Sequence, residues 1–257
     1  MSSIEKNLNE LSKIQEMQQR SHWMNELHPL GKLLVSVLYI VLVASINKYD
    51  IVTLILMSVY LVFIFVIGDL SFRDGIYRMR LVLPLVIFVG IFNPFFDKTV
   101  LFYIGKIGIS TGMLSMLTLV IKGVYTVLAA YSLIITTSID DICYAFGCIK
   151  MPKIMILVIM LIYRYFGVMA EEAGRITTAY SLRAPSQKGI QYSAWGTLVG
   201  QWLLRSMDRA ERVYESMLLR GFKGDFNTVK KKVKKTDIIF PVVWIVVFIL
   251  IRWRVIL

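Results

Sequence analysis

The apolar residues of this chain gather in long runs that short polar segments separate. Five runs are candidate membrane spans: 33–46, 51–67, 81–92, 113–136 and 238–251. A transmembrane helix needs about 20 mainly apolar residues. The short run at 81–92, which contains Pro84, either crosses with help from its flanks or enters a protein-lined crevice. The pattern predicts an all-α integral membrane protein with about five transmembrane helices.

A sixth apolar run, 153–170, allows more than one placement. The stretch 164–235, which begins inside this run, carries fourteen basic and six acidic residues. Basic loops tend to stay in the cytoplasm, and four spans return the chain to that side by about residue 137. A full crossing by 153–170 would place the basic stretch outside the cell. We therefore expect 153–170 to dip into or lie along the membrane boundary and to stay on the cytoplasmic side.

Three helices are expected in this cytoplasmic stretch. A capping pattern starts a helix over 139–149. The next helix, 153–183, turns from apolar to amphipathic and is stopped by a proline. After a polar linker with glycines, apolar residues recur every three or four positions over 201–220, and Gly221 suits the left-handed position just past that helix.

These elements divide the chain into four segments. Residues 1–32 form a cytoplasmic or interfacial segment, which is either a short surface helix or a polar tail, and 33–136 form a four-span membrane bundle. Residues 137–236 form a cytoplasmic module of long amphipathic helices, and 237–257 form a C-terminal transmembrane helix.

Composition supports the membrane class and excludes a soluble nucleic-acid binder. Hydrophobic residues make up 57% of the chain, whereas an average soluble domain has about 45–50%. Lysine and arginine outnumber aspartate and glutamate by 29 to 17. The run "KKKVKK", 230–235, immediately precedes the last span, and we interpret it as an orientation signal and an anchor to anionic lipid rather than a nucleic-acid site.

No motif for catalysis, metal binding or cofactor binding is found in the sequence. Neither Gly-Lys dipeptide has the upstream glycine and the following serine or threonine of a phosphate-binding loop. The histidines and cysteines have no metal-ligand spacing, and the cysteines are expected to be ordinary buried thiols: His22, His28, Cys143 and Cys148. We expect a non-catalytic chain without a cofactor of its own.

Lys122 lies near the middle of the fourth predicted span. An ionised side chain there costs about 2.5–3.5 kcal/mol on insertion scales, so it should face a partner or a wet cavity. Two interpretations remain. The lysine is paired within the bundle or snorkels to the interface, or it serves a surface that faces a substrate-binding partner.

Two amphipathic helices end in similar tripeptides, Leu182-Arg183-Ala184 and Leu219-Arg220-Gly221. A cation in the last turn of a helix is stabilising by itself, and capping would explain either arginine alone. The recurrence of the pattern within the most basic stretch favours partner docking. An arginine at a helix end can bind carboxylates through two parallel hydrogen bonds, and an apolar helix end can enter a groove on another protein.

Several longer motifs resemble a known family. They are "HPLGKLL" before the first span, "YRYFGVMAEEAGR" leading to "SLRAP", and "RAERVYESMLLRGFKG". Together they resemble the transmembrane T component of energy-coupling factor (ECF) transporters, a type of ABC importer, and specifically the CbiQ type. In that family two cytoplasmic coupling helices end in Ala-Arg-Gly-like motifs. Both tripeptides here depart from that motif at the first residue, and Ala184 also replaces the usual glycine.

The resemblance implies a mechanical role. The helix ends, with Arg183 and Arg220, would dock on two ABC-type ATPase subunits that bind ATP and magnesium. A separate substrate-binding membrane subunit, CbiM-like or another S component, would capture the substrate. The CbiQ type implies cobalt uptake for cobalamin synthesis across a prokaryotic plasma membrane, with nickel, biotin or another vitamin as alternatives. A self-contained secondary transporter is the rival class, but the sequence has no internal repeat that would support it.

Overall fold

The computed structural model describes residues 18, 23–93, 100–104, 107–185, 187, 189–224 and 234–256. Their contacts divide them into two compact units, described separately below. One unit comprises the described residues of Met17–Ser138 and Lys231–Leu257, and the other those of Ile139–Lys230. We call them the bundle unit and the crossed-helix unit. The predicted surface helix or tail at the N-terminus and most of "KKKVKK" lie outside the described residues.

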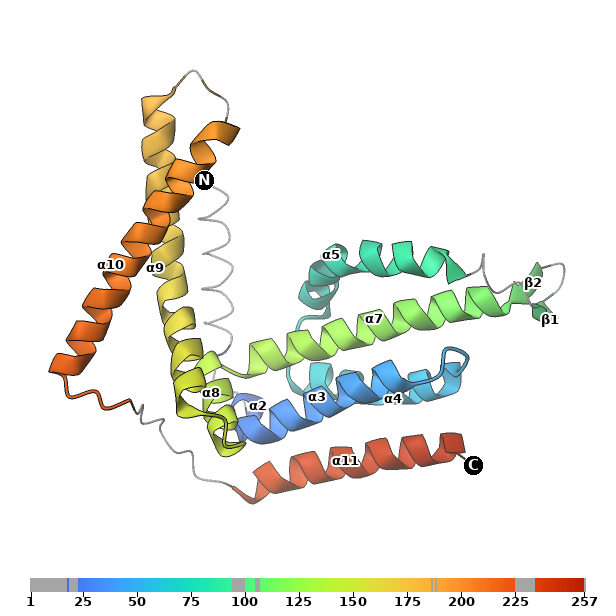
Figure 1. Ribbon diagram of the computed structural model, residues 1–257. Coiled ribbons are helices and arrows are strands. Elements are labelled where there is room, and N and C mark those ends of the chain that lie inside the picture. Colours follow the sequence, from blue (N-terminus) through green and yellow to red (C-terminus); the bar gives the residue numbers. More distant parts are fainter. Residues whose placement is uncertain are drawn as a thin grey trace. The chain divides into compact units, whose positions relative to one another are not determined.

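The bundle unit consists of apolar helices packed around α7 (Figure 1). It contains α2 (Trp23–Glu26), α3 (Pro29–Ser45), α4 (Ile51–Ile67), α5 (Phe72–Ile91), α7 (Thr111–Thr136) and α11 (Lys235–Ile256). Helix α7 packs against α3, α4 and α5, and α11 packs against α3 and α4. A two-stranded antiparallel sheet, β1 (Val100–Ile104) and β2 (Ile107–Ser110), precedes α7.

Buried aromatic side chains join α3, α4 and α11. The rings of Tyr39 and Tyr60 lie 4.5 Å apart between centroids, and Trp244 meets Tyr60 edge-on at 4.8 Å. The Tyr39 hydroxyl donates to the Met57 carbonyl at 3.2 Å, so this phenol is not left unpaired in an apolar core. Aromatic pairs of this kind fix how the three helices pack.

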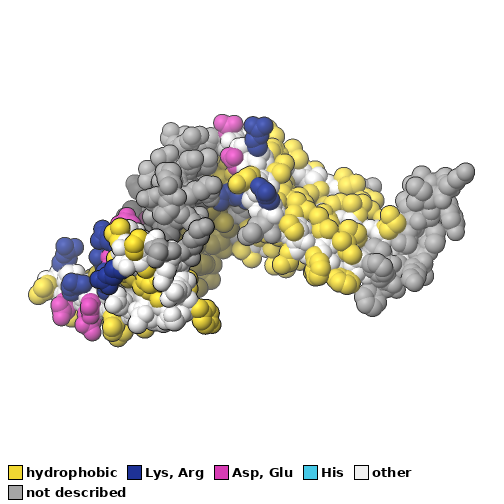
Figure 2. All heavy atoms as spheres, turned by 90° about the horizontal axis from the view of Figure 1, so that it is seen from above, with side chains coloured by type: hydrophobic (Ala, Val, Ile, Leu, Met, Phe, Trp, Pro, Cys, Tyr) yellow, Lys and Arg dark blue, Asp and Glu magenta, His cyan; other side chains and the backbone are white. Residues whose placement is uncertain are grey.

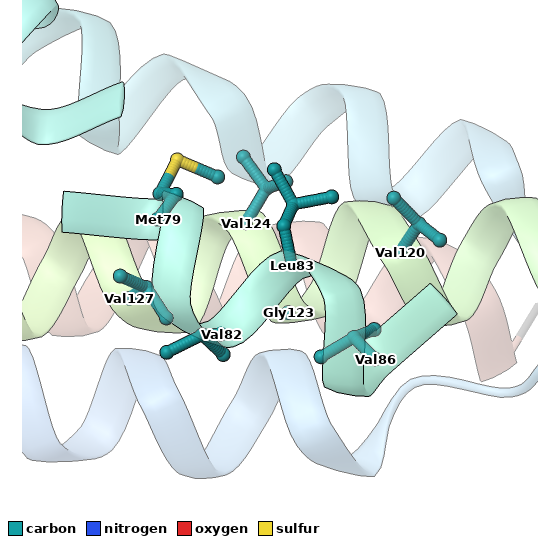
Figure 3. Close-up of a pocket in the computed structure, with 8 residues that line it drawn as sticks. All are labelled: Met79, Val82, Leu83, Val86, Val120, Gly123, Val124 and Val127. Atoms are coloured by element: carbon teal, nitrogen blue, oxygen red, sulfur yellow. The ribbon is translucent and has the colours of Figure 1, made fainter. Parts of the chain in front are cut away.

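Helix α5 begins earlier than the predicted span at 81–92. It starts at Phe72 and runs through Arg73, Arg78 and Arg80 and through Pro84. Arginine is a good helix former, and Asp74 in the first turn suits the helix dipole. Figure 3 shows Val82, Leu83 and Val86 of α5 lining a small pocket together with residues of α7, and a Cβ on Gly123 of α7 would lie 3.2 Å from Val86. Close packing on α7 thus holds the helix together around its proline.

The bundle unit and α9 carry the apolar surface of a membrane protein. Among the described residues, three helices are long and apolar enough to cross a membrane, namely α7, α9 and α11, and shorter apolar helices cover Pro29–Ser45, Ile51–Ile67 and Val82–Ile91. Figure 2 shows hydrophobic side chains over a broad area, with charged side chains in separate groups. The predicted class of helical membrane protein is therefore confirmed. Because α9 meets the criteria for a span, the boundary location of 153–170 stays a prediction.

The crossed-helix unit contains α8 (Ile139–Cys148), α9 (Lys153–Arg183), the short 3-10 helix η1 (Tyr192–Ala194) and α10 (Trp195–Leu219). The predicted helices over 139–149 and 153–183 are confirmed. The third helix begins at Trp195, not at residue 201, because Gly196 and Gly200 are helical and do not form a linker. A helical glycine costs only about 1 kcal/mol relative to alanine, which packing of α10 on α9 can offset.

Candidate functional site

Helices α9 and α10 meet near the middle of each helix. The Trp202 indole Nε1 of α10 donates to the Met169 carbonyl of α9 at 3.2 Å. Next to this contact the Arg205 guanidinium binds the Glu172 carboxylate, which also lies 3.6 Å from Nη1 of Arg175. Two residues three apart on α9 thus bind two residues three apart on α10. We call this contact the crossing.

The two predicted tripeptides lie at opposite ends of the crossed pair (Figure 1). A helix rises about 1.5 Å per residue, so Arg183 lies about 16 Å along α9 from Glu172, and Arg220 about 22 Å along α10 from Arg205. The chain direction reverses between the helices, and the two ends point away from each other. The structure therefore brings the residues of each tripeptide together but keeps the two tripeptides apart.

Each tripeptide presents an exposed leucine and an exposed arginine. Leu182 is 77% exposed and Leu219 is 90% exposed. The Arg183 and Arg220 side chains are exposed as well, and neither has an ion pair or hydrogen bond among the described residues. Single exposed apolar residues are common on protein surfaces, and they mark interaction sites when they cluster with other binding groups, as each leucine here does with an arginine. We call Leu182-Arg183-Ala184 the α9 tip and Leu219-Arg220-Gly221 the α10 tip.

The two tips end their helices differently. In the α10 tip Gly221 has φ +80°, its N–H donates to the Leu218 carbonyl at 2.9 Å, and the Phe222 N–H donates to the Met217 carbonyl at 3.0 Å. This is a Schellman cap. In the α9 tip Ala184 has φ −130° and donates to the Tyr180 carbonyl at 3.2 Å. Alanine is therefore tolerated in the α9 tip because no left-handed residue is needed there.

We expect Gly221→Ala to loosen the α10 tip without any steric clash. A Cβ at this position meets no atom within 4 Å, so the cost is the left-handed backbone alone, about 1–2 kcal/mol. Gly196→Ala, in the same helix and also in open space, should instead stabilise α10 by about 0.5–1 kcal/mol. Hydrogen exchange of the amides of 217–222 should accelerate only in Gly221→Ala. Equal exchange in the two variants would contradict this account of the cap.

The sequence of this chain is similar to that of a known protein family over most of its length. The sequence profile of CbiQ, described as cobalt transport protein, matches residues 20–233, which is most of the chain. The chain belongs to the CbiQ family. The chain is also 30% identical over 90 residues to an uncharacterized protein of Methanocaldococcus jannaschii, a match that covers 35% of this chain and 34% of that protein. The chain thus spans about a third of that relative's length. The predicted family is confirmed, and its description is that of a transport protein.

In this CbiQ-family protein an apolar groove of about 480 Å³ opens between the first half of α9 and the second half of α10. Apolar side chains of both helices line most of it, among them Leu157, Leu161, Val213, Met217 and Phe222. Phe222, the residue after the Schellman glycine, therefore connects the α10 tip to the groove. A second set of apolar residues on α10 is exposed beside it: Leu203, Leu204, Met207, Tyr214 and Leu218.

The structure places Lys122 against the end of a neighbouring helix. Its ammonium group donates to the Ala44 carbonyl at 3.4 Å and also to the Ile46 carbonyl, at the C-terminal end of α3. On the other side of that end Arg252 of α11 donates to the Ser45 carbonyl at 3.5 Å. Helix C-termini carry unpaired carbonyls and favour cations. Lys122 is thus paired inside the bundle, and this pairing explains how a cation can lie in the middle of an apolar helix.

A second lysine, Lys32 of α3, binds the C-terminal end of α7. This contact was not predicted from the sequence. Lys32, in the first turn of α3, is 4% exposed, and its ammonium group donates to the Thr136 carbonyl at the end of α7 at 2.6 Å. Helices α3 and α7 thus each provide a lysine for the C-terminal end of the other. Lys32 lies in the motif "HPLGKLL", which also supplies the cap of α3, because His28 Nδ1 accepts from the Leu30 N–H at 3.3 Å.

The cysteines need one correction. Cys143 is buried, as predicted, but Cys148 is exposed at the end of α8. Burial, with a smaller contribution from Asp140, raises the pKa of the Cys143 thiol and keeps it protonated. Cys148 is the last residue of α8, and its exposure there was not evident from the sequence pattern. His22 lies outside the described residues.

Proposed function

We propose that this chain is the T component of an ECF-type ABC importer. It transmits ATP-driven motion from two ATPase subunits to a substrate-binding membrane subunit, and cobalt is the substrate. The observation that carries the proposal is a crossed pair of long helices with an exposed Leu-Arg tip at each far end. Such a pair suits a lever better than a catalytic centre or a channel.

The tips are suited to two separate partners. Each offers a guanidinium with unused donors for a carboxylate and, next to it, an apolar side chain for a groove. Because the tips lie at opposite ends of the crossed pair, one ATPase subunit would hold each tip. ATP and magnesium would be bound by those subunits, and this chain itself would need no cofactor.

The crossing is suited to carry motion between the tips. Arg205 and Glu172, with the Trp202 hydrogen bond beside them, join α9 and α10 at the crossing. When the ATPase subunits close on ATP and reopen after hydrolysis, the tips move with them, and the helices pivot about this contact. The pivot would tilt or release the substrate-binding subunit.

The apolar surfaces of the crossed pair support contact with that subunit. The groove between α9 and α10 is open, and Ile154, Ile162 and Phe166 of α9 are exposed next to it. A CbiM-like or other S component would cover them. The CbiQ family description supports cobalt as the substrate, while specificity for cobalt, nickel, biotin or another vitamin would reside in that subunit. The multi-pass chain would lie in a prokaryotic plasma membrane with the crossed helices in the cytoplasm.

Co-purification of the ATPase subunits tests the proposal. Wild-type protein and Arg183→Glu with Arg220→Glu are co-expressed with the two ATPase subunits, and the proteins retained through a tag on this chain are quantified. The double variant should retain neither subunit, while Arg164→Glu with Arg212→Glu, two exposed arginines away from the tips, should retain both. Full retention by the tip variant would refute docking through the tips.

A further inference from the structure

A second cavity lies on the opposite side of the crossing from the apolar groove, and polar and apolar side chains line it in similar measure. It has a volume of about 400 Å³ and lies between the second half of α9 and the first half of α10. Three arginines line it, Arg175 and Arg183 from α9 and Arg205 from α10, and Gln201 adds an amide. We call it the arginine cavity. Arginines from two helices thus converge on one space.

The arginine cavity keeps a positive charge after internal pairing. Glu172 is the one carboxylate bound to its arginines within the described chain, and it contacts only Nη1 of Arg175 and Nη1 of Arg205. A guanidinium has five N–H donors, so most donors of both groups remain available. Arg183 has no acidic partner among the described residues. Two charges of the three are therefore uncompensated, and they are placed to bind an anion through paired hydrogen bonds.

Tyr180 lines the arginine cavity, and its hydroxyl group holds the neighbouring loop in place. The Tyr180 hydroxyl donates to the Gln187 amide oxygen at 3.0 Å and accepts from the Gln191 N–H at 3.3 Å. These bonds tie the connection between α9 and η1 back onto α9. The loop end of the cavity is thus held in place by the protein itself and does not depend on a ligand.

A stripe of two exposed aromatic residues and a valine runs from η1 into α10 beside the cavity. Tyr192 is 95% exposed, and Trp195 and Val199 are each 50% exposed. They are three and four positions apart, and Trp195 and Val199 directly follow the cavity-lining Ala194 and Leu198. Tyrosine and tryptophan favour the headgroup region of a bilayer, where one side of the ring is apolar and the other is wet.

We propose that the arginine cavity binds the phosphate of an anionic membrane lipid, with the glycerol and acyl portion along Tyr192, Trp195 and Val199. A carboxylate of a protein partner would satisfy the arginines but would leave the aromatic stripe uncovered. A phosphodiester attached to acyl chains matches both parts of the site, and it carries the three-dimensional spread of oxygens that several arginines can share. The lipid would hold the α9 side of the crossed pair at the membrane surface.

This site goes beyond the coupling function and can be measured without any partner subunit. Arg183 belongs to both the arginine cavity and the α9 tip, whereas Arg175 and Arg205 belong to the cavity and the crossing but to neither tip. Lipid binding to the isolated chain therefore does not depend on ATPase docking, and failure of one proposal leaves the other standing.

Calorimetric titration of the full chain in neutral detergent tests the lipid site. The probes are dihexanoylphosphatidylglycerol, dihexanoylphosphatidylcholine with the same chains, glycerol phosphate as the headgroup alone, and hexaglutamate. We expect saturable binding of the phosphatidylglycerol only. Arg175→Gln with Arg183→Gln should weaken it by at least about tenfold, because charge-assisted hydrogen bonds are lost. Arg205→Lys keeps the charge beside Glu172 and should weaken it less. Arg164→Gln with Arg212→Gln is the matched control and should bind as wild type.

Four results would overturn the lipid site. Equal affinity for phosphatidylcholine would mean that acyl chains alone bind. Glycerol phosphate as tight as the lipid would mean a site for small phosphates. Tighter binding of hexaglutamate would assign the cavity to an acidic protein partner. Unchanged phosphatidylglycerol affinity in the cavity double variant would place lipid binding elsewhere on the chain.

Discussion

A protein that carries Arg183→Glu together with Arg220→Glu should remain in the membrane yet support no ATP-driven cobalt uptake above that of cells lacking the transporter. Both arginines are exposed and have no partner among the described residues, so their replacement removes no internal contact. Reversing the charge turns attraction to an acidic groove into repulsion, which commonly costs several kcal/mol at an interface.

The single variants separate the contributions of the two tips. Arg183→Glu and Arg220→Glu alone should each lower uptake by about tenfold or more, since the other tip still holds one ATPase subunit. Uptake is measured with radioactive cobalt in cells that contain equal amounts of each variant. Arg164→Glu with Arg212→Glu should transport normally. Wild-type uptake by the double tip variant would show that the arginines do not transmit the motion.

Lys32→Met should destabilise the bundle by about 1–3 kcal/mol, the cost of leaving a buried acceptor unpaired. The ammonium group of Lys32, a residue that is 4% exposed, donates to the Thr136 carbonyl at 2.6 Å. Methionine has a similar length, so the change removes the donor and leaves little cavity. The expected result is a clearly lower Tm in detergent.

Two controls distinguish this effect from a general loss of packing. Leu34→Met lies close in sequence but is exposed, so its Tm should equal that of the wild type. Lys122→Met should cost less than Lys32→Met, because Lys122 is only half-buried and Arg252 also binds the end of α3. If Lys32→Met unfolds at the same temperature as Leu34→Met, the lysine does not stabilise the end of α7.

Local patterns were sufficient to predict the helices 139–149 and 153–183 and the C-terminal end of α10. Prolines and a glycine mark the ends of 153–183 and of α10, and each tip is a tripeptide that can be recognised without knowing its neighbours. The beginning of α10 was predicted wrongly because Gly196 and Gly200 are typical of linkers. Nothing within the helix itself signalled that packing against α9 would keep them helical.

Contacts between distant residues were not predictable from one sequence. Lys32 and Thr136 are 104 positions apart, and Glu172 and Arg205 are 33 apart. In the sequence Lys32 looks like an ordinary charge that flanks a span, and Arg205 looks like one of several arginines on a polar face. Their roles depend on which helix ends meet, and that is set by the packing of whole helices, not by local spacing. The arginine cavity was missed for the same reason.

Site-directed photocrosslinking tests the central claim, that the two tips contact ATPase subunits, most directly. Benzoylphenylalanine replaces Leu182, Leu219 or, as a control in the middle of α10, Leu203; all three side chains are exposed. After irradiation of the co-expressed proteins, the account predicts an adduct with an ATPase subunit from position 182 and from position 219, and none from position 203. Transport-competent protein that yields no ATPase adduct from either tip would contradict it.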